Sequence, residues 1–482
     1  MTTPSQQPYD AEIALRLRAA RQDHLIQHAD SLAPSQRAVF FEQLRDLDLD
    51  ALPSLIREYV QNKPAVTLPD DLRPVDFYPH DTTAQRKPWN RTATRAKGEE
   101  LIRAGKVAAF TVAGGQGSRL GYDGPKGCYP ATAITRKPLF RIFAEGLLAT
   151  HRRYGRAIPW YIMTSPLNHD ATIAFFEQHS HFGLDPRDIA FFQQGSMPSF
   201  DITTGRILLA DRGRLATNPD GHGGAIRALH VSGSLDDMRN RGIEHLSYFQ
   251  VDNPIVRVVD PVFIGLHATA PDSSGEMSSK MVTKTGPDER VGVFCRSGGR
   301  TMVVEYSDLP ATLANERLAD GTLRFTAGSI AIHVMSVAFL SRVATDPASS
   351  LPYHRAEKVV EVFDPATGGT IRPEKPNAVK LERFIFDALP LCESSIVLET
   401  DRIEEFAPIK NAEGVDSPAT STAIQTERAA RWLEAVGVKI PRDAQGRAEC
   451  VIEVSPLTAL EGGDVRHTTL PAELIRGGRT VL

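Results

Sequence analysis

Short apolar segments alternate with helical segments through the middle of this 482-residue chain, and this alternation limits its fold more than any other feature. The expected strands lie at residues 107–113, 159–165, 189–194 and 246–252. Residues 138–155 and 168–180 have the pattern of helices and lie between them. Strands that alternate with helices are typical of a doubly wound, mostly parallel sheet with helices on both faces. We therefore predict an α/β protein with a central domain at residues 95–410.

Two further regions flank this central domain. Residues 11–29 and 35–52 place apolar side chains at three- and four-residue spacing, and residues 63–81 form a proline-rich linker that is expected to wrap back onto the body. We therefore expect a helical N-terminal region with its linker at residues 1–94. The expected strands come closer together from about residue 278, which favours an antiparallel insertion. The turn-rich residues 436–456 predict a small β unit in a C-terminal domain at residues 411–482.

Composition restricts the environment and the partners of the chain. The net charge of -4 and the pI of about 6.4 give no general attraction to nucleic acid or to an anionic membrane. No apolar run approaches the length that spans a bilayer, and the N-terminus lacks the apolar core of a secretory signal. The four cysteines are far apart and form no C-x-x-C pair, which is typical of free thiols in a reducing cytoplasm. We therefore expect a cytoplasmic protein.

The loop after the first expected strand, "AGGQGSRLGYDGPKG" (113–127), combines glycines with an arginine and a lysine. Glycines this dense cost backbone entropy, so the loop needs tight turns or a close approach of backbone to a ligand. In open α/β sheets, ligands bind at the carboxyl ends of the strands. Gly114 and Gly115 would let a flat base lie on the backbone, and Arg119 and Lys126 would face an anionic group beyond it. The alternative is a surface turn with two solvated cations.

Two familiar phosphate-binding loops do not fit this segment. A dinucleotide-binding loop needs G-x-G-x-x-G, but Leu120 occupies the third glycine position after Gly115 and Gly117. A P-loop needs G-x-x-x-x-G-K-[ST], and "GPKG" at residues 124–127 breaks that register. What remains is a strand, a glycine turn and two separated cations.

This loop resembles the signature of the UDP-sugar pyrophosphorylases (uridylyltransferases), roughly L-A-G-G-x-G-T-R-L-G-x-x-x-P-K-G, and most closely that of the UDP-N-acetylglucosamine pyrophosphorylase branch. Further segments resemble family blocks in family order, among them "FFQQGSMPSFD", "NPDGHGGAIRAL", "YFQVDNPIVRVVDPVFIG", "AGSIAIHV", "RPEKPNAVKLERFIFD" and "FAPIKNAEGVDSP". The resemblance covers roughly residues 20 to 460. It implies a doubly wound nucleotidyltransferase domain with a helical N-terminal part and a small C-terminal domain.

The resemblance also implies a reaction. A sugar 1-phosphate oxygen attacks the α-phosphate of UTP, which yields a UDP-sugar and pyrophosphate. Two polyanions meet, so catalysis depends mostly on positioning and charge neutralisation. Arg119, Lys126 and Lys410 match the family's catalytic cations, although Lys410 taken alone is a surface lysine. Asp252 ends an expected strand, where a carboxylate can hold Mg²⁺ that bridges phosphates or can cap the next turn.

Further residues match positions that contact the base and the sugar. The nucleotide-binding residues implied are Ala113, Gly114, Gly115, Gln194, Gly221 and His222. The sugar-binding residues implied are Gly292, Glu305, Ser329 and Phe386. An amide side chain and backbone groups can pair with the donors and acceptors of a pyrimidine edge. Gly292 would leave room for an N-acetyl group and Phe386 would pack against its methyl, so N-acetylglucosamine 1-phosphate is the expected substrate.

Three positions depart from the family's hexosamine enzymes, which usually carry asparagine where this chain has Ser329, Ile332 and His222. Because Ser329 is shorter than asparagine, we expect weaker discrimination against glucose 1-phosphate. A histidine at position 222 would make recognition of uracil sensitive to pH. Synthesis of UDP-glucose or UDP-galactose is the alternative within the family.

Two alternatives lie outside the family. A nucleotide-sugar glycosyltransferase has a similar domain but commonly carries an Asp-x-Asp metal motif, whereas this strand ends in "VDNP". A non-catalytic UDP-sugar-binding protein would not need the set of four charged residues, Arg119, Lys126, Asp252 and Lys410. Release of pyrophosphate distinguishes uridylyl transfer from both.

Overall fold

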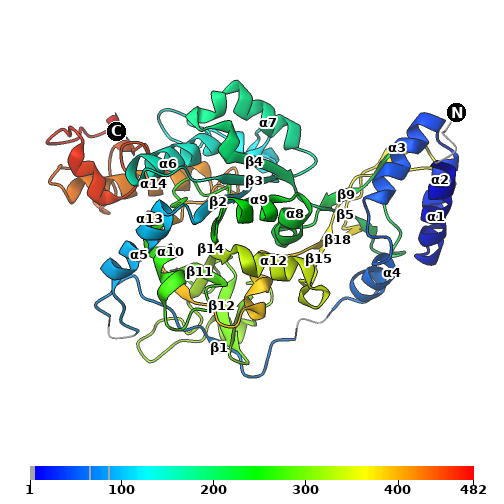
Figure 1. Ribbon diagram of the computed structural model, residues 1–482, viewed down its shortest axis with the longest axis horizontal. Helices are drawn as coiled ribbons and strands as arrows, with labels where there is room; N and C mark the ends of the chain where they lie inside the picture. Colours follow the sequence, from blue (N-terminus) through cyan, green and yellow to red (C-terminus); the bar gives the residue numbers. More distant parts are fainter. Residues whose placement is uncertain (1–5, 65–66, 85–86) are drawn as a thin grey trace. The chain divides into compact units, whose positions relative to one another are not determined.

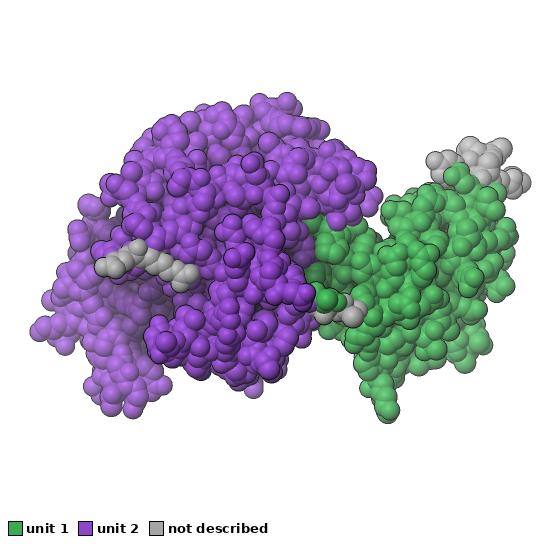
Figure 2. Space-filling model, turned by 90° about the horizontal axis from the view of Figure 1, so that it is seen from below, with its two compact units in different colours: residues 1–67, 194–225, 351–385 green, residues 68–193, 226–350, 386–482 purple. Residues whose placement is uncertain are grey.

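The computed structural model describes residues 6–64, 67–84 and 87–482, and its contacts divide the chain into two compact units (Figure 2). Unit 1 comprises residues 1–67, 194–225 and 351–385. Unit 2 comprises residues 68–193, 226–350 and 386–482. The chain therefore passes repeatedly from one unit to the other. The domain boundaries expected from the sequence, after residues 94 and 410, stay predictions.

Unit 2 is built on a ten-stranded sheet (Figure 1). Its main parallel part consists of β10 (His245–Gln250), β2 (Val107–Val112), β3 (Trp160–Thr164) and β4 (Ile189–Gln193), paired in this order. The four strands expected from the sequence are thus confirmed. The other strands are β1 (Arg73–Pro74), β11 (Met277–Thr283), β12 (Val293–Ser297), β13 (Arg300–Val304), β14 (Ala327–Ser336) and β19 (Val397–Glu399). Strand β14 is antiparallel to β10, β11 and β12, which confirms the antiparallel insertion.

Helices cover both faces of this sheet. They are α5 (Arg91–Arg103), α6 (Leu139–Tyr154), α7 (His169–Gln178), α8 (Ala225–Val231), α9 (Ser234–Asn240), α10 (Pro261–Thr269), α11 (Ala311–Ala314) and α12 (Val337–Thr345). Successive side chains of a strand point to opposite faces. In β2, Ala109 joins the core formed with α5, α6 and α10, whereas Phe110 contacts Tyr248 on the other face. On that second face Tyr161 donates a hydrogen bond to Asp237 of α9 at 2.5 Å. The sheet is therefore doubly wound, as expected.

The two ends of unit 2 lie against its body. Strand β1 pairs with β12, and the Tyr78 N–H donates to the Val397 carbonyl at 2.8 Å, so the described part of the linker returns to the sheet as expected. The C-terminal elements are α13 (Arg402–Glu405), α14 (Pro418–Glu434), β20 (Val451–Glu453) and β21 (Arg479–Val481). Strands β20 and β21 pair in parallel and pack with α14 around a small core of their own. This is the β unit expected near the C-terminus.

Unit 1 begins with helices, as the sequence predicts. They are α1 (Gln6–Ala19), α2 (Asp23–Asp30), α3 (Pro34–Arg45), α4 (Leu52–Leu55) and the π-helix η1 (Ile56–Gln61). Two later segments add the strands β5 (Ser196–Pro198), β6 (Phe200–Asp201), β7 (Leu209–Asp211), β8 (Arg214–Leu215), β9 (Thr217–Pro219), β15 (His354–Lys358), β16 (Val362–Asp364), β17 (Gly369–Ile371) and β18 (Ala378–Glu382). Of these, β5, β6, β7, β8, β16 and β18 share a core with the helices. The buried Gln22, at the start of α2, joins the helices to the segment between β6 and β7, because its amide donates to the Gly205 carbonyl and accepts from the Ile207 N–H. The sequence did not predict this association of distant segments.

Two expectations from composition can be compared with the structure. Among residues 6–64, 67–84 and 87–482, no helix is both long enough and apolar enough to cross a bilayer. All four cysteines, Cys128, Cys295, Cys392 and Cys450, are buried and free, as expected. Burial raises the pKa of Cys128 and of Cys295 to about 12, so these thiols are protonated and unreactive at neutral pH.

Candidate active site

The carboxyl ends of β2 and β10 bring two sequence-predicted positions to one edge of the sheet. Ala113, which follows β2, donates its N–H to the Met163 carbonyl at 2.8 Å. The N–H of Val251, which follows β10, donates to the Val112 carbonyl at 3.1 Å, and Asp252 comes next. Because β2 and β10 are parallel neighbours, the glycine loop and Asp252 leave the sheet side by side. Ligands bind at this edge in open α/β sheets.

The glycine loop folds back on itself after β2. The Gly117 N–H donates to the Gly124 carbonyl at 2.9 Å, and the Lys126 N–H donates to the Gly115 carbonyl at 3.0 Å. Gly124 has φ 139°, a conformation that L side chains rarely adopt. A Cβ on Gly115 would meet no atom within 4 Å, so the space above this backbone is open, as a stacked base requires.

A residue that the sequence analysis missed fixes the start of this loop. The buried Asn168 donates its side-chain amide to the Ala113 carbonyl at 2.9 Å and to the Gly115 carbonyl at 3.2 Å. Its Oδ1 accepts from the Ser165 N–H at 2.8 Å, so β3 holds the loop that follows β2. An asparagine three residues after a predicted strand was the available signal.

Lys126 and Asp252 face one another at the sheet edge. The Lys126 Nζ lies 3.8 Å from the Asp252 Oδ2, and the side chains are 15% and 13% exposed. This distance is an ion pair but too long for a hydrogen bond. Both groups therefore keep donors and lone pairs for a ligand. Arg119 is exposed in the short 3₁₀ helix η2 (Ser118–Leu120), and the described residues give it no ion pair, which leaves its guanidinium available to an anion.

Lys410 reaches the same edge from a distant part of the chain. The N–H of Ile409 donates to the Asp252 carbonyl at 2.8 Å, which fixes the neighbouring Lys410 beside the end of β10. The Lys410 N–H donates to the Asp416 carbonyl at 2.6 Å, and its Nζ lies 3.5 Å from the Asp416 Oδ2. The structure thus brings together Lys126, Asp252 and Lys410.

A small cavity of about 60 Å³ opens at this point. Its lining consists of Phe249, Gln250, Asp252, Asn253, Ser329, Ile330, Ala331, Ile332, Phe406 and Lys410. Ala331 has φ 54°, and the pairing of β14 with β11 shifts register nearby. Backbone strain and β-bulges of this kind gather at functional sites, where they re-aim side chains. The sequence did not predict this irregularity, which lies beside Ser329.

Three predicted sugar-binding residues also lie together. The Ser329 N–H donates to the Gly292 carbonyl at 2.8 Å. A Cβ on Gly292 would lie 3.1 Å from the Glu305 Oε1 and 2.7 Å from the Val303 Cγ1. The space over Gly292, in the direction of its missing side chain, is therefore filled by Glu305 and Val303. The expectation that Gly292 leaves room there for an N-acetyl group was wrong, because glycine instead permits the close approach of these two side chains. Phe386 is buried in the short 3₁₀ helix η8 (Ile385–Leu391), and its contact with a sugar stays a prediction.

Three predicted nucleotide-binding residues, Gln194, Gly221 and His222, belong to unit 1. Gln194 is buried. Gly221 has φ 85°, and a Cβ there would lie 2.4 Å from the Arg383 carbonyl oxygen, so only glycine fits. Their contact with a base stays a prediction.

The environment of His222 contradicts its expected sensitivity to pH. Its Nδ1 accepts from the Ile385 N–H at 3.1 Å, and its ring stacks on Phe384 with centroids 5.1 Å apart. Burial and the neighbouring His354 lower the pKa of His222 to about 4. The ring is therefore neutral near pH 7 and keeps its proton on Nε2. The expectation of titration near neutral pH was wrong because it ignored packing.

The sequence of this chain matches a family of known proteins. Residues 54–418 match the family model described as UTP–glucose-1-phosphate uridylyltransferase. The chain belongs to this family. The *Saccharomyces cerevisiae* UDP-N-acetylglucosamine pyrophosphorylase is 35% identical, over 87% of this chain and 90% of the relative. The human UDP-N-acetylhexosamine pyrophosphorylase-like protein 1 is 34% identical, over 94% and 93%.

Solved structures of uridylyltransferases share the fold. The putative UDP-N-acetylglucosamine pyrophosphorylase of *Entamoeba histolytica* is 31% identical with a TM-score of 0.72, and covers 85% of this chain and 98% of its own. The *Trypanosoma brucei* UDP-N-acetylglucosamine pyrophosphorylase, solved with an inhibitor, is 27% identical with a TM-score of 0.81 over 98% of both chains. The expected fold, α/β of the nucleotidyltransferase type, is thereby confirmed. Membership of this enzyme family also favours uridylyl transfer over the glycosyltransferase and the non-catalytic binding protein.

Proposed function

We propose that this uridylyltransferase forms UDP-N-acetylglucosamine and pyrophosphate from UTP and N-acetylglucosamine 1-phosphate, with Mg²⁺. The observation that carries the proposal is the convergence of Lys126, Asp252 and Lys410 at the carboxyl ends of parallel strands. Two cations and a carboxylate suit a reaction between two phosphates better than a reaction that needs a covalent nucleophile.

Each charged residue has a distinct role in the proposed reaction. A phosphate oxygen of the sugar 1-phosphate forms a bond to the α-phosphorus of UTP, and the bond from that phosphorus to the bridging oxygen of pyrophosphate breaks. Lys126 neutralises the charge that grows on the α-phosphate, and Arg119 holds the β- and γ-phosphates that leave. Lys410 binds the phosphate of the sugar 1-phosphate. Such fixed cations act most strongly where water is excluded, and Lys126 is largely buried.

The residues at this edge fit Mg²⁺ of the kind that is shared with a substrate. Among the described residues there is no cluster of three or more His, Cys, Asp or Glu side chains that could hold a metal ion. Mg²⁺ commonly takes one or two carboxylates together with substrate phosphates and waters, which the single carboxylate of Asp252 satisfies. When bound, the ion would offset phosphate charge beside Lys126.

The proposed preference for an amino sugar is supported by the relatives. Several curated relatives at 34–36% identity are named as UDP-N-acetylglucosamine enzymes. Glu305 lies directly over Gly292, and Ser329 is hydrogen-bonded to Gly292 through the backbone, so these residues can form one wall of a sugar pocket. The shorter Ser329 leaves one polar contact to water, which weakens discrimination by about two- to tenfold. UDP-glucose synthesis is the second candidate.

We place this reaction in the cytoplasm, with small molecules as partners. Four buried free thiols suit a reducing compartment, and the moderate net charge suits neither nucleic acid nor membrane. UTP, the sugar 1-phosphate, the UDP-sugar and pyrophosphate are the expected ligands.

Pyrophosphate release from UTP tests the proposal. We expect release with N-acetylglucosamine 1-phosphate, slower release with glucose 1-phosphate, and none in excess chelator. Asp252→Asn keeps the shape but removes the charge, so it should lower activity and raise the Mg²⁺ concentration that is needed. Undiminished activity in chelator would remove Asp252 from the metal role. Turnover of glucose 1-phosphate alone would establish the second candidate.

A further inference from the structure

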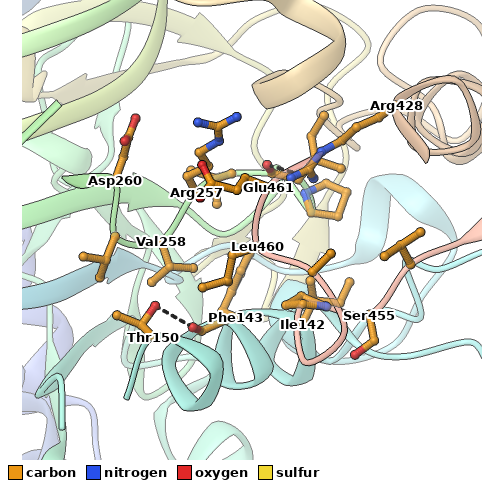
Figure 3. Close-up of a pocket in the computed structure, with 18 of the residues that line it drawn as sticks. Ile142, Phe143, Thr150, Arg257, Val258, Asp260, Arg428, Ser455, Leu460 and Glu461 are labelled. Carbon is orange, nitrogen blue, oxygen red and sulfur yellow. Dashed lines mark hydrogen bonds between the residues drawn. The ribbon is translucent and has the colours of Figure 1, made fainter. Parts of the chain in front are cut away.

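Unit 2 contains a second cavity, whose lining shares no residue with the candidate active site (Figure 3). It offers about 100 Å³ to the centres of water-sized molecules, which is room for several waters or one small ligand. Its walls are α6, residues 254–261 after β10, α14 and the segment from β20 to residue 461. The cavity thus lies between the sheet's helices and the C-terminal elements.

The cavity has one apolar wall and one charged wall, in which Asp260 and Glu461 lie near the arginines. Figure 3 shows Ile142 and Phe143 of α6 on one side, and Arg257 and Arg428 on the opposite side. Sites for small organic ligands combine such apolar surface with a few polar groups that fix orientation. A ligand with an anionic head and a short carbon body matches this lining.

The two arginines make few hydrogen bonds for the number of their donors, although both lie within ion-pair distance of Glu404, at 3.4 and 3.8 Å. Their side chains are only 17% and 15% exposed. Each guanidinium carries five N–H donors. Within the described residues, Arg257 donates one hydrogen bond to the Glu404 carboxylate, and Arg428 donates one to the Ile255 carbonyl, each at 3.4 Å. The Nε atoms of both are buried without a hydrogen bond within the described chain.

Carboxylates close to these arginines are already engaged. The Asp260 Oδ2 accepts from the Lys280 Nζ at 2.6 Å, and the Glu461 Oε2 accepts from Arg95 at 2.8 Å. Both oxygens of Glu404 accept from the Trp432 Nε1, at 3.0 and 3.1 Å. Both oxygens of Glu405 accept from the Lys280 Nζ, at 2.8 and 2.6 Å. Burial lowers the pKa of Arg428 to about 10, which still leaves it charged at neutral pH. Buried donors without acceptors are costly, so an anion between the arginines would be stabilising.

This wall is continuous with the candidate active site. Residue 254 follows Asp252 after a single residue, and Arg428 already contacts the same segment at Ile255. Helix α14 is also joined to the segment that carries Lys410, because the Ser421 Oγ donates to the Ala407 carbonyl at 2.7 Å. An anion that binds both arginines would therefore restrain the segments that hold Asp252 and Lys410.

We propose that this cavity is a second, regulatory site, which takes a small carboxylate- or phosphate-bearing molecule between Arg257 and Arg428. The anionic oxygens accept from the guanidinium N–H groups, and the carbon body lies against Ile142 and Phe143. Occupancy changes the KM for UTP through residues 254–261. The site is independent of which sugar 1-phosphate the enzyme uses.

Calorimetric titration of the full chain with two probes tests the binding site. Citrate represents carboxylates and inorganic phosphate represents phosphates, so the two titrations separate the two chemistries. Whichever probe binds to the wild-type protein, Arg428→Gln should raise its Kd about tenfold or more. The matched control is Arg431→Gln, which changes an exposed arginine of the same helix and should leave binding unchanged. Equal affinity in wild type and Arg428→Gln would overturn the proposal.

Hydrogen exchange of the wild-type protein gives a test that needs no variant. The bound probe should protect amides at residues 254–260 and 425–432. Protection confined to residues 114–126 would place the anion in the active site and overturn the proposal, as would no protection by either probe at millimolar concentration.

Initial rates test the regulatory role. The probe should shift the KM for UTP in wild type and in Arg431→Gln, and the shift should disappear in Arg428→Gln. A shift that persists in Arg428→Gln, or binding without any shift, would contradict regulation through this cavity.

Discussion

The Asn253 side chain donates to the Glu405 carbonyl oxygen at 2.6 Å, across 152 residues of sequence. Its Oδ1 also accepts from the Ala407 N–H at 3.1 Å. Both groups of this buried amide are thus used to join the end of β10, where Asp252 lies, to the segment that leads to Lys410. Asn253 is therefore a positioning residue for both charged groups.

We expect Asn253→Ala to impair catalysis without removing any charged group. Loss of the two hydrogen bonds should destabilise the fold by about 1–3 kcal/mol, because the Ala407 and Glu405 backbone groups lose their partner. It should also lower kcat at least tenfold, because misplacement by about 1 Å is costly in a reaction that depends on positioning. Steady-state kinetics and urea unfolding measure the two effects separately.

Asn315→Ala, at an exposed position in unit 2, is the control and should change neither quantity. If Asn253→Ala lost stability but kept wild-type kcat under conditions where it is folded, its role would be structural only.

Lys280 lies between two carboxylates in the interior of unit 2. It is 1% exposed, and its Nζ lies 2.6 Å from both the Asp260 Oδ2 and the Glu405 Oε2. Lys280→Met would leave two buried carboxylates without their cation, which should cost about 3–5 kcal/mol at neutral pH. Urea unfolding gives this difference in the free energy of unfolding.

The loss of stability caused by Lys280→Met should depend on pH. Although burial opposes it, the charges of Lys280 and Arg257 lower the pKa of Asp260 below its ordinary value. A lowered carboxyl pKa contributes stability above the unfolded pKa of about 4, and this stability is lost as the pH falls further. The difference between wild type and Lys280→Met should therefore shrink below about pH 4. A constant difference down to pH 3 would show that Asp260 does not depend on Lys280.

Because the His222 ring is neutral, we expect this residue to cause no change in the KM for UTP near neutral pH. Its pKa of about 4 keeps the ring neutral, so protonation of this residue should not alter the KM for UTP between about pH 6 and 8. His222→Asn, which cannot titrate, should give the same profile in steady-state kinetics. A transition near the ordinary histidine pKa of about 6.5 in wild type, absent from His222→Asn, would show that the ring is charged in the working enzyme.

Substitutions at Gly292 and Ser329 should change the use of N-acetylglucosamine 1-phosphate in opposite directions. Gly292→Ala would place a methyl group 2.7 Å from the Val303 Cγ1 and 3.1 Å from the Glu305 Oε1, so both side chains must shift. The KM for N-acetylglucosamine 1-phosphate should rise about tenfold while the KM for UTP is unchanged. Ser329→Asn should increase the preference for N-acetylglucosamine 1-phosphate over glucose 1-phosphate by about two- to tenfold. The ratio of kcat/KM values measures this preference, and an unchanged ratio in both variants would show that the sugar binds elsewhere.

The elements of the site were predictable because their signals are local. The strand that ends at Asp252 and the glycine loop with Lys126 are each readable within a short stretch of sequence. Asn168, Asn253 and the strained Ala331 were not predicted, because their roles depend on partners in other strands and segments.

The assembly of unit 1 from three separate segments of the chain was not predicted, for the same reason. Apolar side chains recur at helical spacing in the N-terminal helices. That spacing does not reveal which other segments of the chain these helices pack against. The buried Gln22 bonds to residues more than 180 positions away, a pairing that only the folded chain defines.

Activity of Lys126→Ala tests the central claim most directly, namely that the Lys126–Asp252 edge is where uridylyl transfer occurs. Loss of one fixed cation at the reacting phosphate should lower kcat about a hundredfold or more, equivalent to about 3 kcal/mol. UTP affinity should change much less, since the other loop contacts stay. Lys106→Ala, which changes a partly exposed lysine paired with Glu244, should keep wild-type kcat. A wild-type kcat for Lys126→Ala in the pyrophosphate-release assay would contradict the account.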